Sequence, residues 1–215
     1  MKAKKNLGGR PSQAETGQIE TRILDAACDL FFSEGYGATS IDALATKACV
    51  SKRTFYDRYK DKPDVFRAVV KHVIGNMRPA NADTLFAPGK LEDVLERVAI
   101  AMMNIMLSAP LISLHRLLLA EAPRFPELVQ LVYEEGTRQE AVERIALLLS
   151  QEAKLKRITL NNPAFIAEQF VMMVIGAPQR RLMMGLAKPM TPRETKEWAL
   201  NTTGFFLNGF YNAKD

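Results

Sequence analysis

Residue types on which catalysis and covalent cross-linking depend are scarce in this chain of 215 residues. It has two cysteines, Cys28 and Cys49, and two histidines, His72 and His115. Neither pair has metal-ligand spacing, so we expect reduced thiols and neither a metal nor a cofactor. Glycine and serine motifs of nucleotide-binding and hydrolytic enzymes are also missing. The sequence therefore predicts no catalytic residues.

Long apolar runs are missing as well. No segment approaches the roughly 20 apolar residues that a membrane span requires. The lysines near the start precede GGRPSQAETG and not the apolar core of a signal peptide. We therefore expect a cytoplasmic protein without a membrane partner. The chain has 215 residues, of which 47% are hydrophobic. This is enough to build a substantial core, divided between one small and one larger domain.

The segment TSIDALATKACVSKRTFYDRYKDK, residues 39–62, has the pattern of two short helices joined by a tight turn. Thr39 or Ser40 can cap the first helix, and Ser51 can cap the second. Phe55 and Tyr59 share an apolar face of the second helix. Its opposite face carries the polar side chains of Lys52, Arg53, Thr54, Asp57 and Arg58. This arrangement is typical of a helix-turn-helix, whose second helix can enter the major groove of DNA.

The distribution of charge separates this interpretation from an ordinary helical hairpin with a solvated face. Residues 1–78 contain 14 Lys and Arg against 9 Asp and Glu, whereas residues 79–215 contain 15 of each. The whole positive excess thus lies in the first third of the chain. A solvated face needs no such bias, but a surface that displaces counterions from phosphates does.

The remaining sequence predicts an all-α protein with four parts. Residues 1–17 form a basic arm, containing Lys2, Lys4, Lys5 and Arg10, which is either a minor-groove contact or a disordered tail. A three-helix DNA-binding domain over residues 18–62 begins with a helix at 18–34. A connecting helix follows at 63–80, and residues 81–215 are expected to form a larger helical bundle. Within that bundle, Pro, Gly and Asn separate predicted helices at 91–107, 111–122, 126–151, 163–186 and 192–211.

Two stretches resemble one known family. FFSEGYGATSIDALATKACVSKRTFYDRYKDKPDVF resembles the TetR family of bacterial one-component transcriptional regulators, and the similarity covers about residues 18–75. LHRLLLAEAPRFPELVQLVYEEG, residues 114–136, resembles an AefR-type C-terminal domain found in many repressors of efflux and related systems. Cys49 departs from the family pattern, which usually has Gly in the turn. A positive φ there costs a non-glycine residue about 1 kcal/mol.

The resemblance implies two sets of DNA contacts. Base edges would be read by Lys52, Arg53 and Thr54, and phosphates would be held by Thr39, Ser40, Ser51, Tyr56 and Lys62. Arg53 suits a guanine because its guanidinium can donate two parallel hydrogen bonds. Asp57 follows Arg53 by one helical turn, so it either orients that guanidinium or accepts from a cytosine.

We expect a homodimeric repressor that binds a palindromic operator in double-stranded DNA, hence at the nucleoid, and is released by a small, mostly apolar ligand. Residues 81–215 would then be the ligand-binding and dimerisation domain. Apolar side chains of its last two helices either pair with a second subunit or fill the internal core. Candidate ligand-binding residues are Met102, Met106, His115, Leu118, Phe125, Phe165, Met172 and Met173. Two alternatives are a ligand-independent architectural DNA-binding dimer and a small all-α enzyme.

Overall fold

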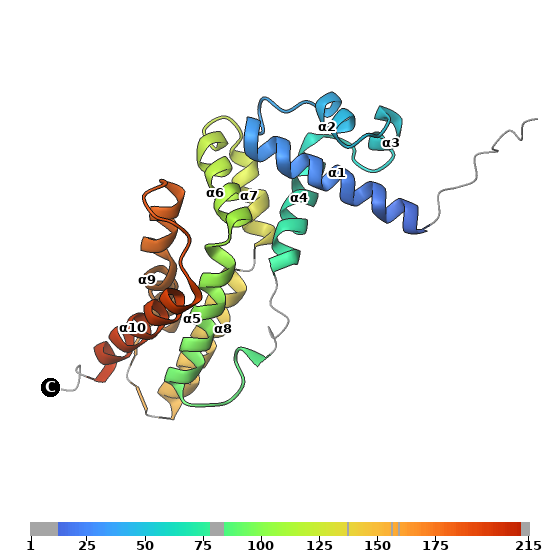
Figure 1. The fold of residues 1–215 in the computed structure, drawn as a ribbon. Coiled ribbons are helices and arrows are strands. Elements are labelled where there is room, and N and C mark those ends of the chain that lie inside the picture. The colour runs from blue at the N-terminus through green and yellow to red at the C-terminus, as the bar shows by residue number, and fades with distance from the viewer. Residues whose placement is uncertain (1–12, 78–83, 137, 156, 159, 212–215) are drawn as a thin grey trace, which may run out of the picture.

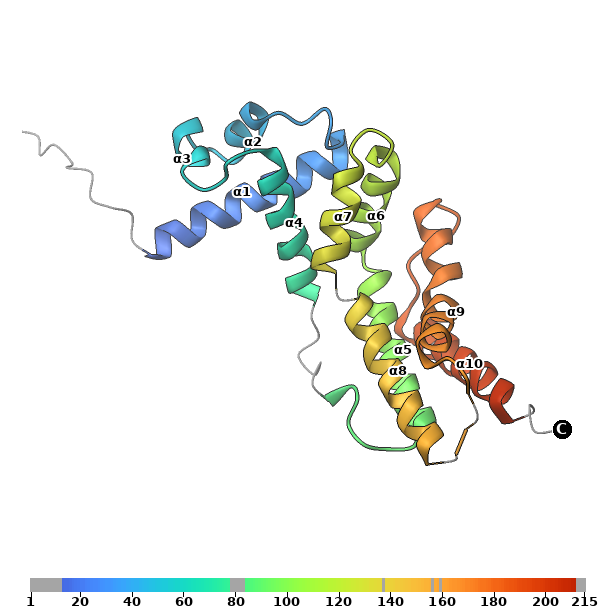
Figure 2. The same cartoon turned by 180° about the vertical axis from the view of Figure 1, so that it is seen from behind.

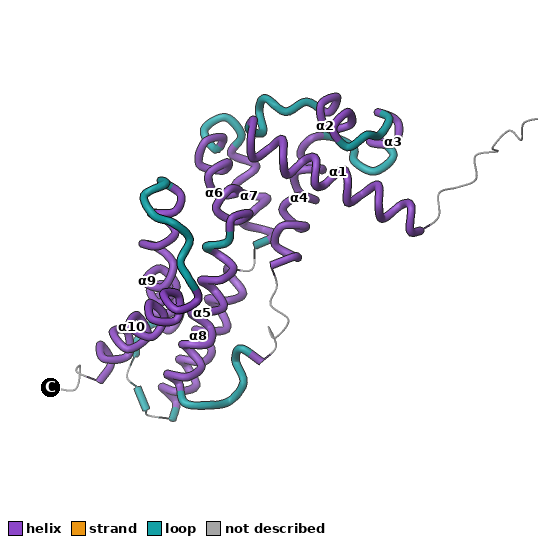
Figure 3. Tube along the Cα trace, viewed as in Figure 1, coloured by secondary structure: helices purple, strands orange, loops and turns teal. Residues whose placement is uncertain are grey.

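The computed structural model describes residues 13–77, 84–136, 138–155, 157–158 and 160–211. These residues form helices and connecting turns without any strand (Figure 3), which confirms the predicted all-α fold. The order along the chain is shown in Figure 1. The helices are α1 (Gln13–Glu34), α2 (Ile41–Lys47), α3 (Lys52–Tyr56), α4 (Lys62–Met77), α5 (Leu91–Met106), α6 (Ala109–Glu121), α7 (Pro126–Glu135), α8 (Arg138–Lys154), α9 (Pro163–Met183) and α10 (Pro192–Tyr211).

Several helix boundaries differ from the sequence-based prediction, and three of the differences have a local physical cause or consequence. α1 begins at Gln13 and not at Gln18, so residues 13–17 are helical and not part of the arm, whose residues 1–12 lie outside the described chain. The single helix predicted over 126–151 is two helices, α7 and α8, because α7 ends at Gly136. A Cβ atom on Gly136 would lie 2.8 Å from the Val132 carbonyl oxygen, so the chain turns there only with glycine. α9 ends at Met183 because Gly185, at φ +70°, stops the helix.

Buried side chains divide the molecule into two hydrophobic cores. The first core joins α1–α4 to α6 and α7, and includes Phe31, Phe66 and Leu114. The second core joins α5, α8, α9 and α10, and includes Phe170. From behind, Figure 2 shows α6 and α7 beside α4, while α9 packs against both α5 and α8. The predicted bundle over residues 81–215 is therefore split, because α6 and α7 pack with the DNA-binding helices.

The junction between α5 and α6 is where the two cores meet. The two helices are bent by 64° across residues 107–108. Met106, at the end of α5, packs against both cores. Within the described residues no single helix is long and apolar enough to span a membrane. Only this bent pair of helices, taken together, reaches the length and apolar composition of a span.

A side chain of α10 completes the backbone hydrogen bonding of α9. Pro178 lies inside α9 and has no N–H, so the carbonyl of Val174, four residues earlier, lacks its helical donor. The indole Nε1 of Trp198, on α10, donates to that carbonyl oxygen at 2.9 Å. Since Val174 is fully buried, this contact satisfies a carbonyl that water does not reach.

Replacing Trp198 with phenylalanine tests this account. We expect Trp198→Phe to lower the free energy of unfolding by about 1–3 kcal/mol, because the Val174 carbonyl loses its donor. Urea unfolding followed by circular dichroism measures the change. Pro178→Ala provides the matched background, since the alanine N–H can bond to the same carbonyl. An equal loss in both backgrounds would show that the indole contributes only packing.

Candidate DNA-binding site

The first elements of the site are two short helices, each capped by a serine. The Ser40 hydroxyl accepts from the Ala43 N–H at 3.1 Å and begins α2. The Ser51 hydroxyl accepts from the Thr54 N–H at 3.0 Å and begins α3. These bonds satisfy backbone donors that the first turn of a helix leaves open. The predicted caps are therefore present, with Ser40 as the cap of the first helix.

The turn between these helices is a Schellman motif. The Val50 N–H bonds to the Ala45 carbonyl at 3.0 Å, and the Cys49 N–H bonds to the Thr46 carbonyl at 3.1 Å. Cys49 has φ +53° and is the only non-glycine residue with positive φ in the described chain. Cys49 thus adopts the positive φ considered for this turn, and the turn keeps the two hydrogen bonds of the motif without glycine.

One face of α3 is buried and the other is exposed. Phe55 is fully buried and Tyr59 is 6% exposed, so both pack inward as predicted. On the other face, Lys52, Arg53 and Tyr56 are exposed. The packing of Phe55 therefore fixes which side chains of α3 face the solvent.

The exposed cations of α3 have different surroundings. The Lys52 ammonium bonds to the Asp42 carboxylate at 2.8 Å, and that hydrogen bond raises the pKa of Lys52. The Arg53 guanidinium has no hydrogen bond or ion pair with other described residues. Asp57 makes no ion pair with Arg53, so the structure does not show the first of the two roles expected for Asp57, the orientation of that guanidinium. Arg53 is thus the cation of α3 whose donors are all available.

Two residues predicted to hold phosphates, Thr39 and Lys62, contact the loop between α1 and α2. Thr39 is 1% exposed, and its hydroxyl donates to the Gly35 carbonyl at 2.8 Å. The Lys62 ammonium lies 4.5 Å from the centre of the Tyr36 ring. Its three backbone acceptors are the carbonyl oxygens of Tyr36 at 2.9 Å, Gly37 at 3.4 Å and Thr39 at 3.0 Å. Both side chains therefore stabilise the loop that leads into α2.

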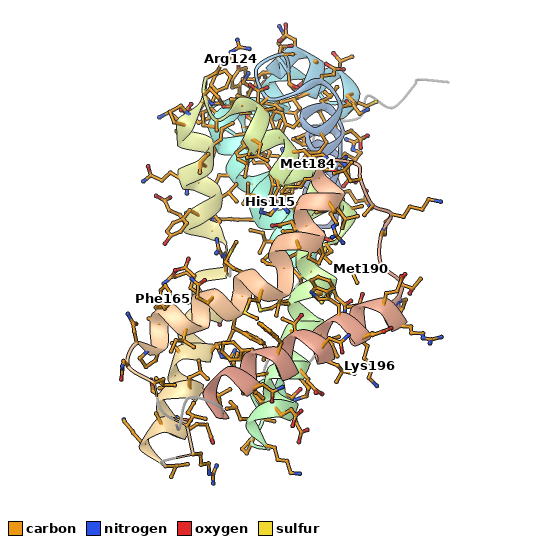
Figure 4. The ribbon with its side chains drawn as sticks, turned by 90° about the vertical axis from the view of Figure 1, so that its left-hand side faces the viewer. His115, Arg124, Phe165, Met184, Met190 and Lys196 are labelled. Atoms are coloured by element: carbon orange, nitrogen blue, oxygen red, sulfur yellow. The ribbon has the colours of Figure 1, made fainter. Side chains whose placement is uncertain are left out.

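This loop, residues 35–40, also contacts the corner between α6 and α7. The Gly37 N–H donates to the Glu121 carboxylate at 3.0 Å, and the rings of Tyr36 and Phe125 meet edge to face at 5.1 Å. A Cβ atom on Gly35 would lie 2.7 Å from a Glu121 carboxylate oxygen, so the close approach requires glycine. Figure 4 shows the neighbouring Arg124 at this end of the molecule.

Sequence reasoning did not place Glu121 in the site. The signal available was the pair of glycines around Tyr36, since adjacent small residues permit another backbone or side chain to approach closely. Glu121 is separated from Gly37 by 84 positions, so helical spacing could not connect them. Arg116, on the same helix, donates to the carbonyls of Met183 at 2.9 Å and Leu182 at 2.6 Å. α6 therefore contacts the α1–α2 loop and the end of α9.

The residues predicted to bind a ligand do not surround one cavity. Leu118 and Phe125 belong to the first core, whereas Met102 and Met173 belong to the second. Met106 touches both cores, and His115 Nδ1 lies 2.7 Å from the Leu111 carbonyl oxygen. Phe165 is 56% exposed and Met172 is 46% exposed, so these two side chains lie on the surface (Figure 4 shows Phe165 at the outer edge of α9).

A cavity of about 330 Å³ lies elsewhere, between the end of α4 and one side of α5. Its lining residues are Met77, Leu85, Arg97, Ile100, Ala101, Asn104 and Ile105. None of the eight predicted ligand-binding residues is among them. The spacing of Arg97, Ile100, Ala101 and Asn104 on one side of a helix could have indicated this cavity from sequence.

Family models match both parts of the chain. The model for bacterial regulatory proteins of the tetR family matches residues 23–69. The model for the C-terminal domain of AefR-like transcriptional repressors matches residues 93–212. The two matched ranges contain the helix-turn-helix and all of α6–α9.

Individual proteins show the same similarity. The HTH-type transcriptional regulator SrpR of Pseudomonas putida is 30% identical over 96 residues, which cover 44% of this chain and 43% of SrpR. The HTH-type transcriptional regulator YezE of Bacillus subtilis is 28% identical over 76 residues, covering 35% of this chain and 39% of YezE. The matched region therefore spans less than half of each of these curated relatives.

Solved structures match over nearly the whole chain. A TetR-family transcriptional regulator from Mesorhizobium loti has a TM-score of 0.74 and 24% identity, and the match covers 93% of this chain and 99% of that one. The flavonoid-responsive regulator FrrA has a TM-score of 0.70 and 25% identity, with 90% and 97% covered.

The fold, the helix-turn-helix and these matches define the class of protein as bacterial helix-turn-helix transcriptional regulators. More narrowly, the chain belongs to the TetR family, and its C-terminal domain is of the AefR-like transcriptional repressor type. Within the described residues, no group of three or more His, Cys, Asp or Glu side chains is placed to hold a metal ion.

The strain at Cys49 gives a testable consequence for stability. We expect Cys49→Gly to raise the free energy of unfolding by about 0.5–1 kcal/mol, because glycine adopts positive φ without steric conflict. Urea denaturation measures the difference. Cys49→Ala is the control, since it removes the thiol but keeps the Cβ atom. Equal stability of the glycine and alanine variants would contradict the backbone explanation.

Proposed function

We propose that the protein is a homodimeric repressor that binds a palindromic operator through α3 and is released by a small, mostly apolar ligand. The observation that carries this proposal is the exposed, unpaired Arg53 guanidinium on a helix whose opposite face is fixed by buried Phe55. An arginine with all its donors available can bond to guanine O6 and N7 in the major groove.

Within α3, Lys52, Arg53 and Thr54 are proposed to face the bases. Their surroundings differ, because Lys52 must exchange its ion pair with Asp42 for a DNA contact. Thr54 is half-buried, and its hydroxyl lies 2.8 Å from that of Ser51. Arg53 alone needs to break no side-chain contact, so we assign it the largest share of base recognition.

The phosphate contacts are assigned to the exposed residues Ser40, Ser51 and Tyr56. Tyr56 is 53% exposed at the end of α3, and its hydroxyl can donate to a phosphate oxygen. Thr39 and Lys62 contribute indirectly, because their side chains hold the loop before α2. Of the five phosphate-contacting residues expected from the sequence, three are therefore proposed to touch DNA directly.

The outer faces of α9 and α10 support the proposal of a homodimer. Phe165 and Met172 are exposed two turns apart on α9, and Phe205 is 74% exposed on α10. One turn after Phe205, a Cβ atom on Gly209 would have no atom within 4 Å, so a partner helix can approach closely there. Exposed apolar side chains beside small residues are typical of helix pairs between subunits.

Dimerisation gives the operator its symmetry. Two α3 helices about 34–36 Å apart would meet successive major grooves on one face of DNA. A ligand can bind more tightly to a dimer in which the two α3 helices have a different spacing. Such a ligand lowers the affinity for DNA by as much as DNA lowers the affinity for the ligand, a coupling free energy of typically about 1–3 kcal/mol. The name of the related regulator FrrA describes it as responsive to flavonoids, and this supports release by a small organic ligand.

The base-reading role of Arg53 is tested on an operator selected from the organism's own genomic DNA. We expect Arg53→Ala to cost about 1–3 kcal/mol on that operator and to relax preference at one base pair per half-site. Fluorescence anisotropy on the operator and on single-base variants measures both effects. The charge-matched control is Arg193→Ala, at an exposed position on α10. Equal losses on operator and unrelated DNA would contradict the role in base reading.

The dimer surface is tested by placing a charge on it. We expect Phe205→Glu to raise the dimer dissociation constant by about tenfold or more, because an interface would bury an unpaired carboxylate. Sedimentation equilibrium measures this constant. Tyr133→Glu is the control, since Tyr133 is 71% exposed on α7, away from α9 and α10. Unchanged association of the Phe205 variant would show that the subunits meet elsewhere.

A further inference from the structure

The cavity between α4 and α5 lies where the two hydrophobic cores face each other. Met77, at the end of α4, packs against the first core. Leu85 and Ile100 line the same cavity and pack against the second core. A molecule in the cavity would therefore touch side chains that belong to both cores.

The lining of this cavity indicates the chemistry of an occupant. Most of its side chains are apolar, and no acidic side chain is among them. Arg97 uses Nε and one Nη to donate to the carbonyls of Leu85, at 3.4 Å, and Ala87, at 2.7 Å. A guanidinium has five N–H donors, so three remain for another acceptor. The amide of exposed Asn104 adds a second polar group at the rim.

We propose that this cavity is the effector site, and that it binds a small molecule with an apolar body and one anionic group directed at Arg97. Its volume of about 330 Å³ lies at the lower end of the range for small-molecule pockets, which run from about 300 to 1,000 Å³. The regulatory part of this inference rests on the proposed ligand-released repressor. The binding part does not, because it can be measured without DNA.

α4 connects the cavity to the DNA-binding helices. The helix has 16 residues and is about 24 Å long, with Met77 at one end and Lys62 at the other. Lys62 holds the carbonyls of the α1–α2 loop, so a displacement of α4 at the cavity moves the loop that leads into α2. A ligand that fits the displaced state better than the other shifts the balance between them.

Two fluorescent probes of the same frame test the site in the full-length protein. 1-Anilinonaphthalene-8-sulfonate has an apolar body and one anionic group, and N-phenyl-1-naphthylamine is its uncharged counterpart. We expect both to bind, and Ala101→Leu to weaken both by about tenfold or more, because the added carbons occupy the cavity. Calorimetric titration gives affinity and stoichiometry. Ala187→Leu, at an exposed loop position, is the matched control and should leave both affinities unchanged.

The role of Arg97 is tested by the difference between the probes. We expect Arg97→Met to weaken the sulfonate by about tenfold, since a charge-assisted hydrogen bond is lost. The uncharged probe should keep its affinity within about twofold. This selective loss supports the site even where Ala101→Leu fails to fold. Equal weakening of both probes would overturn the anion contact.

The outcomes separate the site from the proposed function. Unchanged binding of both probes to folded Ala101→Leu protein would overturn the cavity as the site. Probe binding that depends on Ala101 and Arg97, but leaves operator affinity unchanged, would overturn its regulatory role alone. Loss of operator affinity with the sulfonate, absent in the Ala101 variant, supports both. Failure of Arg53→Ala to affect operator binding would count against the proposed function and not against the cavity.

Discussion

The position of the helix-turn-helix depends on a lysine ammonium that is bonded to three backbone carbonyls. Lys62, the first residue of α4, holds the loop between α1 and α2 at Tyr36, Gly37 and Thr39. Burial lowers the pKa of Lys62, and the nearby Glu121 carboxylate opposes that effect. Burial of a charge without hydrogen-bond partners is costly, so the ammonium is stable at this position only while it bonds to the three carbonyls. The loop geometry then sets where α2 and α3 lie.

Glu121 makes the same loop part of a larger assembly. Its carboxylate accepts from Gly37, and on the same helix Arg116 donates to carbonyls at the end of α9. The DNA-binding helices share a core with α6 and α7, whereas α9 and α10 share a core with α5. α6 thus shares a core with the DNA-binding helices and also packs against α9, where the Arg116 guanidinium donates to two carbonyls. This helix therefore joins the DNA-binding part of the molecule to the second core.

The sequence predicted the parts of the structure that depend on local chemistry. Helical periodicity located the helical segments but missed the break between α7 and α8. Serine hydroxyls located the starts of α2 and α3, and the family pattern indicated positive φ at Cys49. The sequence did not predict the contacts between distant segments. The bonds from Lys62 to the carbonyls of the α1–α2 loop join positions that no helical repeat relates, and the phosphate contacts of Thr39 and Lys62 stay predictions. The methionines expected to line a pocket fill gaps in two cores or lie on the surface, since thioether spacing does not distinguish these uses.

The bond between Trp198 and the Val174 carbonyl has an optical consequence. Trp198 is the only tryptophan in the chain, so the ultraviolet emission of the native protein comes chiefly from one indole at the contact of α9 with α10. Its ring is partly exposed, and its N–H is held by a main-chain oxygen. The wavelength and polarisation of that emission depend on the local solvent and on rotation of the ring. The protein therefore contains an intrinsic spectroscopic reporter of the state of these two helices, without any attached dye.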